Sequence, residues 1–268
     1  MEDFQKTKEF EKIFNKLRDR NSGWKIWDDF VTMSAIAISN RVDSEQSGKR
    51  ETEYMRIVKQ YSAEDLNRFA ELFAITVLAF ESDPNQDFLG ALYMQLELSN
   101  VQTGQFFTPY HICELAAKLN TKGIENERVP ISVLEPAAGA GGMIIAFANA
   151  VREKGINYQD AVFFEAWDID KTVAMMCYIQ MSLLGMTGIV VVGNTLSKEV
   201  YEKWFTPMIF TNHWHFRRFV TGILDDCNSK PDFETPVLEP KSISEPPLPV
   251  EIKQESHRLI IKSIFDFQ

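Results

Sequence analysis

The first hundred residues carry hydrophobic positions at the spacing of amphipathic helices. Apolar side chains recur at intervals of three and four in "FEKIFNKL", "WKIWDDFVTMSAIAI", "SAEDLNRFAELFAITVLAF" and "DFLGALYMQLEL". Ser62, with Asp65 three residues later, is typical of a helix N-cap. Because no strand pattern interrupts these segments, we predict a helical domain over residues 1–100.

The pattern changes after residue 130. Short β-branched or apolar runs at 131–135, 161–170 and 188–196 alternate with helical patterns at 141–155 and 171–186. Strands and helices that alternate in this way form parallel βαβ units. We therefore predict an α/β fold with a doubly wound, mostly parallel, Rossmann-like sheet, which binds ligands at the carboxyl ends of its strands.

The composition changes again near residue 223. Six of the eleven prolines lie between Pro231 and Pro249, and the apolar run "LIIKSIF" follows them. Such a stretch favours an extended arm over a packed core element. The predicted organisation is a helical domain at 1–100, a ligand-binding α/β domain at 101–222, and a proline-rich arm at 223–268. We expect this arm to contact the chain itself, a second copy or a protein partner.

The chain is acidic, and this limits the kinds of partner that it is expected to bind. The net charge is −10 and the pI about 5.0. A free-standing nucleic-acid binder usually carries a basic face, so DNA contacts would come from a local patch or a partner subunit. Cys113, Cys177 and Cys227 have no CxxC spacing and indicate neither a disulfide framework nor a zinc site. With no secretory signal and no apolar run of about 18 residues, we expect a cytoplasmic protein without a membrane span.

The glycine-rich stretch "LEPAAGAGG" (134–142) is the main candidate for chemistry. It joins a predicted strand to a predicted helix, and glycine there lets the backbone approach a ligand closely. A phosphate-binding P-loop would need a lysine and a hydroxyl residue after the last glycine, and both are missing. A dinucleotide fingerprint would need a third glycine where Ile144 stands. The remaining ligand class is S-adenosylmethionine, which carries an ammonium group, a sulfonium and a carboxylate.

Polar residues follow each of the three predicted strands. Glu135 ends the first strand and suits the ammonium group, although a solvated strand-end acid would look the same. Asp168 ends the second strand, where its carboxylate could accept hydrogen bonds from the ribose hydroxyls. The alternative is that Asp168 caps the following helix. Asp170 is expected to cap the next helix. Asn194, after the third strand, is placed to read the edge of the adenine.

Two motifs in this order resemble a known family. "TGQFFTP" (103–109), followed by a helix and then "LEPAAGAGG", is similar to the paired cofactor motifs of adenine-specific DNA methyltransferases of the type I restriction–modification M-subunit kind. "DFLGALYMQL" also resembles the helix that precedes these motifs in that family. The resemblance runs from about Asp87 to Leu196 and implies a methyltransferase sheet, S-adenosylmethionine as the cofactor and DNA as the substrate.

The resemblance also implies roles for particular residues. Phe106, Thr108 and Pro109 would close over the methionine part of the cofactor, and by sequence alone Thr108 is also a candidate N-cap with Pro109 in the first helical turn. The implied cofactor residues at and after the strand ends are Glu135, Ala137, Gly139, Gly141, Asp168, Ile169 and Asn194. Glu135 stands where the family has an aspartate, and Asn194 where it frequently has one.

The chain departs from the family at the catalytic loop. The family transfers the methyl group with an Asn/Asp/Ser-Pro-Pro-Tyr/Phe tetrapeptide after its fourth strand, and no such tetrapeptide occurs here. The segment "PMIFTNHWHFRRF" stands nearest to its position, with "MIF" as a fourth strand and Asn212 and Trp214 as substitute acceptor and stacking ring. His213 and His215 lack a third metal ligand. Two hypotheses follow: a DNA adenine methyltransferase, active either alone or only with a partner, or an inactive cofactor-binding relative that assists DNA modification.

Overall fold

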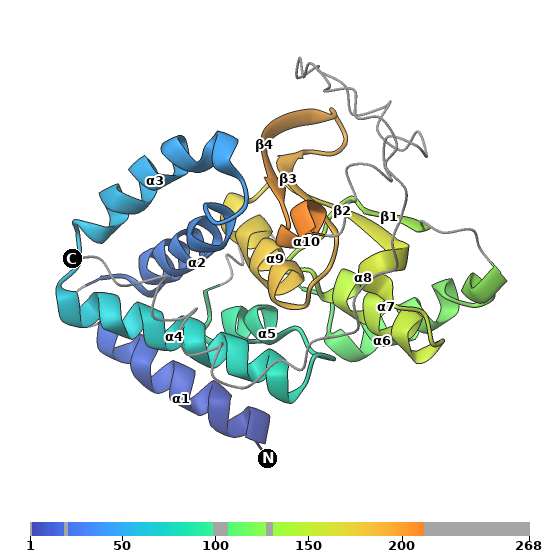
Figure 1. The fold of residues 1–268 in the computed structure, drawn as a ribbon. Coiled ribbons are helices and arrows are strands. Elements are labelled where there is room, and N and C mark those ends of the chain that lie inside the picture. The colour runs from blue at the N-terminus through green and yellow to red at the C-terminus, as the bar shows by residue number, and fades with distance from the viewer. Residues whose placement is uncertain (1, 19–20, 99–106, 127–130, 212–268) are drawn as a thin grey trace, which may run out of the picture. The chain divides into compact units, whose positions relative to one another are not determined.

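The computed structural model of the protein describes residues 2–18, 21–98, 107–126 and 131–211. Their helices and strands belong to one compact unit, Met1–Trp214, with several helices and a four-stranded sheet (Figure 1). The predicted proline-rich arm and the segment with Asn212 and Trp214 lie outside the described residues.

Helices precede the sheet, as the hydrophobic periodicity predicts. They are α1 (Glu2–Leu17), α2 (Gly23–Ser39), α3 (Ser44–Val58), α4 (Ala63–Ser82), α5 (Phe88–Gln95) and α6 (Tyr110–Asn120). The Ser62 side chain accepts the backbone N–H of Asp65, so the predicted cap of α4 is confirmed. The predicted Thr108 cap is wrong, because Pro109 is the N-cap of α6 and makes no side-chain cap bond.

The three predicted parallel strands are confirmed. The chain runs through β1 (Ile131–Glu135), α7 (Gly142–Glu153), α8 (Tyr158–Ala161), β2 (Val162–Asp168), α9 (Lys171–Leu183) and β3 (Gly188–Asn194). β1 pairs with β2 and β2 with β3, both in parallel. The side chain of Asp170 accepts the N–H of Val173 and caps α9, as predicted.

Both crossover helices lie on the same face of the sheet. Phe147 of α7 lies against Phe164 of β2, and Met181 of α9 faces Gly188, the register partner of Phe164 on β3. On the opposite face, Ile209 packs against Phe163, Ile189 and Val191, with Trp167 and Phe205 beside them. The alternation of side chains along β2 and β3 therefore gives the centre of the sheet two apolar faces, as expected for buried parallel strands.

The predicted fourth strand at "MIF" is wrong. Residues Pro207–Thr211 form the short helix α10, and the fourth strand, β4 (Glu199–Phe205), comes earlier and pairs antiparallel with β3. Pro207 favours the helix because its fixed φ suits a first helical turn. The strand is harder to recognise because Glu199, Val200 and Tyr201 are exposed, so its apolar alternation is incomplete.

This correction changes where the chain goes next. Asn194 pairs with Glu199 at the carboxyl end of β3, whereas Ile189 pairs with Phe205 near its amino end. Thr206 bonds the backbone of Gly188 at that same end. The chain therefore leaves β4 and enters α10 at the end of the sheet opposite the glycine loop. Residues 212–215, which are expected from the sequence to form a catalytic loop, lie outside the described residues, and their role stays a prediction.

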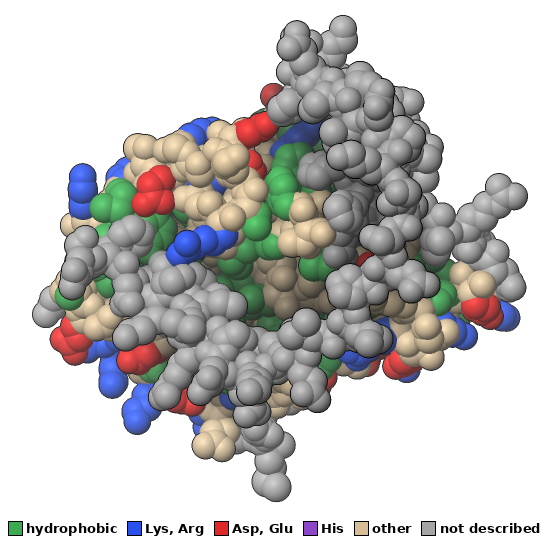
Figure 2. All heavy atoms as spheres, in the orientation of Figure 1, with side chains coloured by type: hydrophobic (Ala, Val, Ile, Leu, Met, Phe, Trp, Pro, Cys, Tyr) green, Lys and Arg blue, Asp and Glu red, His purple; other side chains and the backbone are tan. Residues whose placement is uncertain are grey.

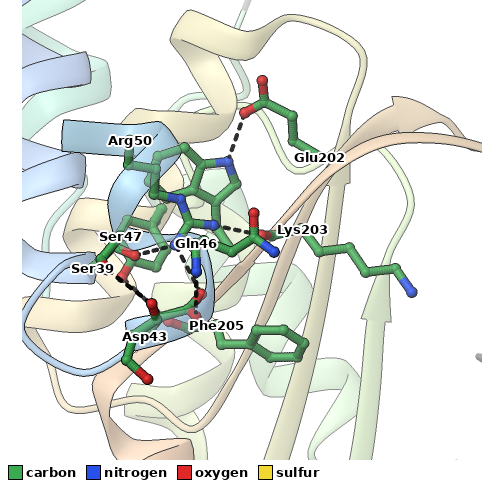
Figure 3. A network of polar contacts seen from close by, with 11 residues as sticks. Ser39, Asp43, Gln46, Ser47, Arg50, Glu202, Lys203 and Phe205 are labelled. Carbon is green, nitrogen blue, oxygen red and sulfur yellow. Dashed lines mark hydrogen bonds and ion pairs between the residues drawn. The ribbon is translucent and has the colours of Figure 1, made fainter. Parts of the chain in front are cut away.

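Arg50 ties the N-terminal helices to β4 (Figure 3). Its guanidinium lies 3.9 Å from the ring centroid of Trp204, donates to Asp43 Oδ2 at 2.8 Å and to the carbonyl of Lys203 at 2.9 Å, and also bonds Ser39. The Arg50 and Asp43 side chains are each 7% exposed. A planar guanidinium can stack and form several directed hydrogen bonds at once, which a lysine cannot do.

We expect Arg50→Ala to lower the free energy of unfolding by about 3 kcal/mol, because it leaves the buried Asp43 carboxylate without its cation. Arg68→Ala is the matched control, since Arg68 pairs within α4 with the exposed Glu64 and with Asp65. That change is expected to lower the free energy by less than about 1 kcal/mol. Urea unfolding of both variants measures the difference, and equal losses would contradict the anchoring role of Arg50.

Candidate cofactor site

A cavity of about 260 Å³ lies at the carboxyl ends of β1 and β2. It is bounded by the start of α5, the segment before α6, the loop after β1 and the first residues of α7 and α9. The residues that line it are Asp87, Phe107, Thr108, Cys113, Glu135, Ala137, Ala138, Gly139, Ala140, Gly142, Met143, Asp168 and Val173. This is the position at which open α/β sheets bind their ligands.

Two glycines make the turn between β1 and α7. Gly139 has φ +57° and Gly141 φ +101°, and both values lie in the region that favours glycine. A Cβ at Gly141 would also lie 3.0 Å from Cys177 Sγ. The turn thus places backbone N–H groups and the N-terminus of α7 close to the cavity without side chains between them.

Three carboxyl groups line the cavity. Burial raises the pKa of Asp87, of Glu135 and of Asp168 above the usual values, while hydrogen bonds to each group oppose the shift. No Lys, Arg or His is among the described residues that line the cavity. Without a ligand, the carboxyl groups of the cavity are either buried anions or protonated. A cationic ligand would offset the free-energy cost of burying the carboxylates.

Asp168 is held at the end of β2 by the backbone. Its Oδ2 accepts the N–H of Gly139 at 3.0 Å, and its Oδ1 accepts the N–H of Asp170 at 2.9 Å. An ionised carboxylate has about four lone-pair positions, so each oxygen can still accept another hydrogen bond. The adjoining Ile169 is 63% exposed and provides an apolar surface next to this acid.

The structure brings together only some of the residues expected from the sequence. Thr108, Glu135, Ala137, Gly139 and Asp168 line the cavity. The other expected residues that the structure describes, Pro109, Gly141, Ile169 and Asn194, are not among its lining residues. Phe106 lies outside the described residues.

Asn194 is engaged in a turn of its own. Its Oδ1 accepts the backbone N–H groups of Leu196 and Ser197 at 3.0 and 3.3 Å. The following residue, Thr195, donates to the carbonyl of Pro136 at 2.6 Å, so the ends of β1 and β3 meet. The adenine-reading role of Asn194 stays a prediction.

Sequence reasoning missed a buried link between the start of α5, α9 and the glycine turn. The Gln180 side-chain amide donates to Asp87 Oδ1 at 2.8 Å and to the carbonyl of Ala140 at 2.7 Å, and its Oε1 accepts the N–H of Leu89 at 3.0 Å. Gln180 is fully buried on α9. A glutamine within the apolar run "MMCYIQMSLL" is the feature that pointed to such a contact, because a buried amide needs partners.

Cys113 is the thiol among the residues that line the cavity. Burial raises the pKa of its thiol to about 11, and the nearby Asp87 adds to this shift. The group is thus a thiol at neutral pH and a poor nucleophile. Among the described residues, no three His, Cys, Asp or Glu side chains are arranged so that they could hold a metal ion together. In the same part of the chain, no helix is long and apolar enough to cross a membrane.

A second cavity of about 590 Å³ lies beside β1. It shares Glu135 and Met143 with the first and is otherwise lined by residues of α6, η2 (Ile124–Asn126), β1 and α7. In the described part of the sheet, no strand pairs with the outer edge of β1, and Leu134 is 59% exposed there. Although this cavity is larger, it lacks the glycine turn and two of the three acids.

The fold and the site define an α/β protein with a glycine-turn ligand site at the carboxyl ends of parallel strands. Residues 85–242 match the N-6 DNA methylase family, and the chain belongs to that family. The match begins just before Asp87 and includes all four strands and the cavity. It supports a function of the DNA adenine methyltransferase type. No curated protein matches the chain.

The raised pKa of Glu135 makes the stability of the empty protein depend on pH. Between the unfolded-state pKa, about 4.3, and the raised folded-state pKa, the folded protein binds more protons. Stability from this group therefore falls as the pH rises through that window. We expect Glu135→Gln to raise the midpoint of thermal unfolding at pH 7, and the difference from wild type to shrink as the pH approaches 4.

The matched control is Glu71→Gln, an exposed acid in the middle of α4, which should leave the midpoint unchanged at both pH values. Thermal unfolding followed by circular dichroism measures all three proteins. A midpoint for Glu135→Gln that equals or falls below wild type at pH 7 would contradict the desolvation of Glu135.

Proposed function

We propose that the cavity binds S-adenosylmethionine and that the chain is the cofactor-binding part of a DNA adenine methyltransferase. The observation that carries this proposal is the set of three carboxyl groups around a glycine turn, with no basic side chain among the described lining residues. A phosphate-bearing nucleotide would meet repulsion there, whereas the ammonium and sulfonium of S-adenosylmethionine would meet opposite charge.

The residues present fit this cofactor. Asp168 is positioned to accept the ribose hydroxyls, and the exposed Ile169 to cover a face of the adenine. Thr108 and Phe107 border the cavity from the segment before α6, where they would lie over the amino-acid part. The cofactor would supply an electrophilic methyl group on a sulfonium, and the described residues bind and orient it.

Methyl transfer also requires groups that hold the target amino group. Two fixed hydrogen-bond acceptors near the adenine nitrogen would be needed, and the loss of one such group lowers a rate on the order of a hundredfold or more. In the described residues, the outer edge of β1, where a doubly wound sheet would continue, has no further strand. We therefore propose that turnover depends on residues beyond 211 or on a protein partner. The doubly wound, Rossmann-like topology is part of the same proposal.

We assign the DNA contacts as well to residues beyond 211 or to a protein partner. On the face drawn in Figure 2, basic and acidic side chains are interspersed among the coloured residues, and the chain carries a net charge of −10. Binding to phosphates without sequence preference depends on clustered Lys and Arg. This distribution supports a subunit that presents the cofactor while other surfaces hold the duplex. A non-catalytic accessory protein with the same cofactor site is the alternative, favoured by the absence of the family's catalytic tetrapeptide.

The experiment that tests catalysis is tritium transfer from labelled S-adenosylmethionine to mixed-sequence DNA by the full chain alone. We expect cofactor binding by calorimetry, together with transfer of less than one methyl group per chain over the assay. Robust multiple turnover by the chain alone would contradict partner dependence. The absence of cofactor binding would contradict the proposed function itself.

The glycine turn gives a separate prediction. Gly141→Val should abolish detectable S-adenosylmethionine binding, because a side chain at φ +101° is strained and would displace Cys177. Gly155→Val is the matched control, since Gly155 also has positive φ, at +77°, but has no atom within 4 Å of an added Cβ. Titration calorimetry should show wild-type affinity for the Gly155 variant, and retained binding by the Gly141 variant would contradict the site.

A further inference from the structure

Asp87 is a carboxyl group of the cavity to which the sequence assigns no role. It caps α5, where its Oδ1 accepts the N–H of Gly90 at 2.9 Å and the Gln180 amide at 2.8 Å. Both of these bonds are made by the same oxygen. The other oxygen, Oδ2, lies between two glycines: it is closest to the position that a Cβ on Gly90 of α5 would occupy, and it is 3.1 Å from the position of a Cβ on Gly142 in the glycine turn.

The two best-anchored acids face opposite ends of the same turn. Asp168 accepts the N–H of Gly139 at one end, and Asp87 Oδ2 faces Gly142 at the other. Asp87 is 9% exposed and is fixed by Gln180, so its oxygen is held in place before any ligand binds. Glu135 is held less firmly, by one 3.2 Å bond from the N–H of Ala137.

Asp87 is a buried carboxyl group that lines the cavity, and among the described residues both of its hydrogen bonds go to Oδ1. Its other oxygen is therefore suited to accept from a primary ammonium group. An ammonium has three donors and no acceptor, and a charge-assisted hydrogen bond to a carboxylate is about twice as strong as a neutral one. The absence of Lys, Arg and His from the described lining leaves this charge to be neutralised by a ligand. With Asp168 suited to the sugar, Asp87 at the other end of the turn suits the amino-acid end.

We propose that Asp87 Oδ2 binds the α-ammonium group of the cofactor, with Glu135 as a second acceptor, and so selects ligands that carry the amino acid over the bare nucleoside thioether. This inference rests on the proposed function, because it assigns a subsite within the same cavity. Asp87 would act in binding and positioning, and would take no part in bond making at the methyl group.

The test is titration calorimetry of the full chain with three ligands. S-adenosylhomocysteine carries the ammonium and the carboxylate on a neutral thioether, decarboxylated S-adenosylmethionine carries the ammonium and the sulfonium without the carboxylate, and methylthioadenosine is a neutral thioether with neither the ammonium nor the carboxylate. Asp87→Asn keeps an oxygen for Gly90 and Gln180 but removes the charge. We expect Asp87→Asn to lower the affinity for the first two ligands by about 10- to 100-fold, and the affinity for methylthioadenosine by less than threefold.

Asp168→Asn is the matched control, because the sugar is common to all three ligands. It should weaken all of them by similar factors. If Asp87→Asn also weakened all three ligands equally, Asp87 would only support the fold and the proposal would be overturned. If Asp87→Asn weakened the binding of none of the ligands, the ammonium group would lie elsewhere and the proposal would also be overturned. Failure of the wild-type chain to bind any of the ligands would overturn the proposed function, and this inference with it.

A second variant covers the case in which Asp87→Asn does not fold. Asp87→Ser keeps a hydroxyl that can cap α5 through Gly90 and removes the carboxylate. The same selective loss of the two ammonium-bearing ligands is expected. If this variant keeps a thermal midpoint near that of wild type and its affinity for all three ligands is unchanged or falls by the same factor, the proposal is overturned.

Discussion

The buried amide of Gln180 is the interaction on which the cavity depends. It joins three segments that are distant in the chain, namely the start of α5 at Asp87 and Leu89, the glycine turn at Ala140, and α9 itself. Every donor and acceptor contact of this amide is made inside the protein, so removing one would leave a buried group unpaired at a loss of about 1–3 kcal/mol. The helices before the sheet thereby determine where one wall of the ligand site stands.

The charge of the cavity follows from the same arrangement. Backbone N–H groups and the Gln180 amide hold carboxyl groups where water is scarce, and burial raises their pKa values. Such a site is unfavourable when empty and gains from a ligand that brings positive charge. This physical preference agrees with membership of the N-6 DNA methylase family, and it includes two acids, Asp87 and Asp168, that lie outside the glycine-rich motif.

The sequence predicted the parts of the fold whose patterns are local. β1, β2 and β3 are short apolar runs separated by helical patterns, and Ser62 and Asp170 cap their helices where expected. β4 was missed because its first three residues are exposed, and α10 was mistaken for a strand although Pro207 marks its start. The candidate site was predicted in part, because Glu135 and Asp168 line the cavity as expected. Asp87 also lines the cavity, but it is held there by a hydrogen bond to Gln180, which is 93 residues away in the chain. Contacts of that separation leave no local pattern.

A crystal structure of the full chain with S-adenosylhomocysteine would test the proposed cofactor site directly. We expect the ligand in the smaller cavity, with ribose oxygens within about 3.2 Å of Asp168 and the amino nitrogen within about 3.2 Å of Asp87 Oδ2. A ligand in the larger cavity beside β1, or one whose amino group points away from Asp87 and Glu135, would contradict the proposed site.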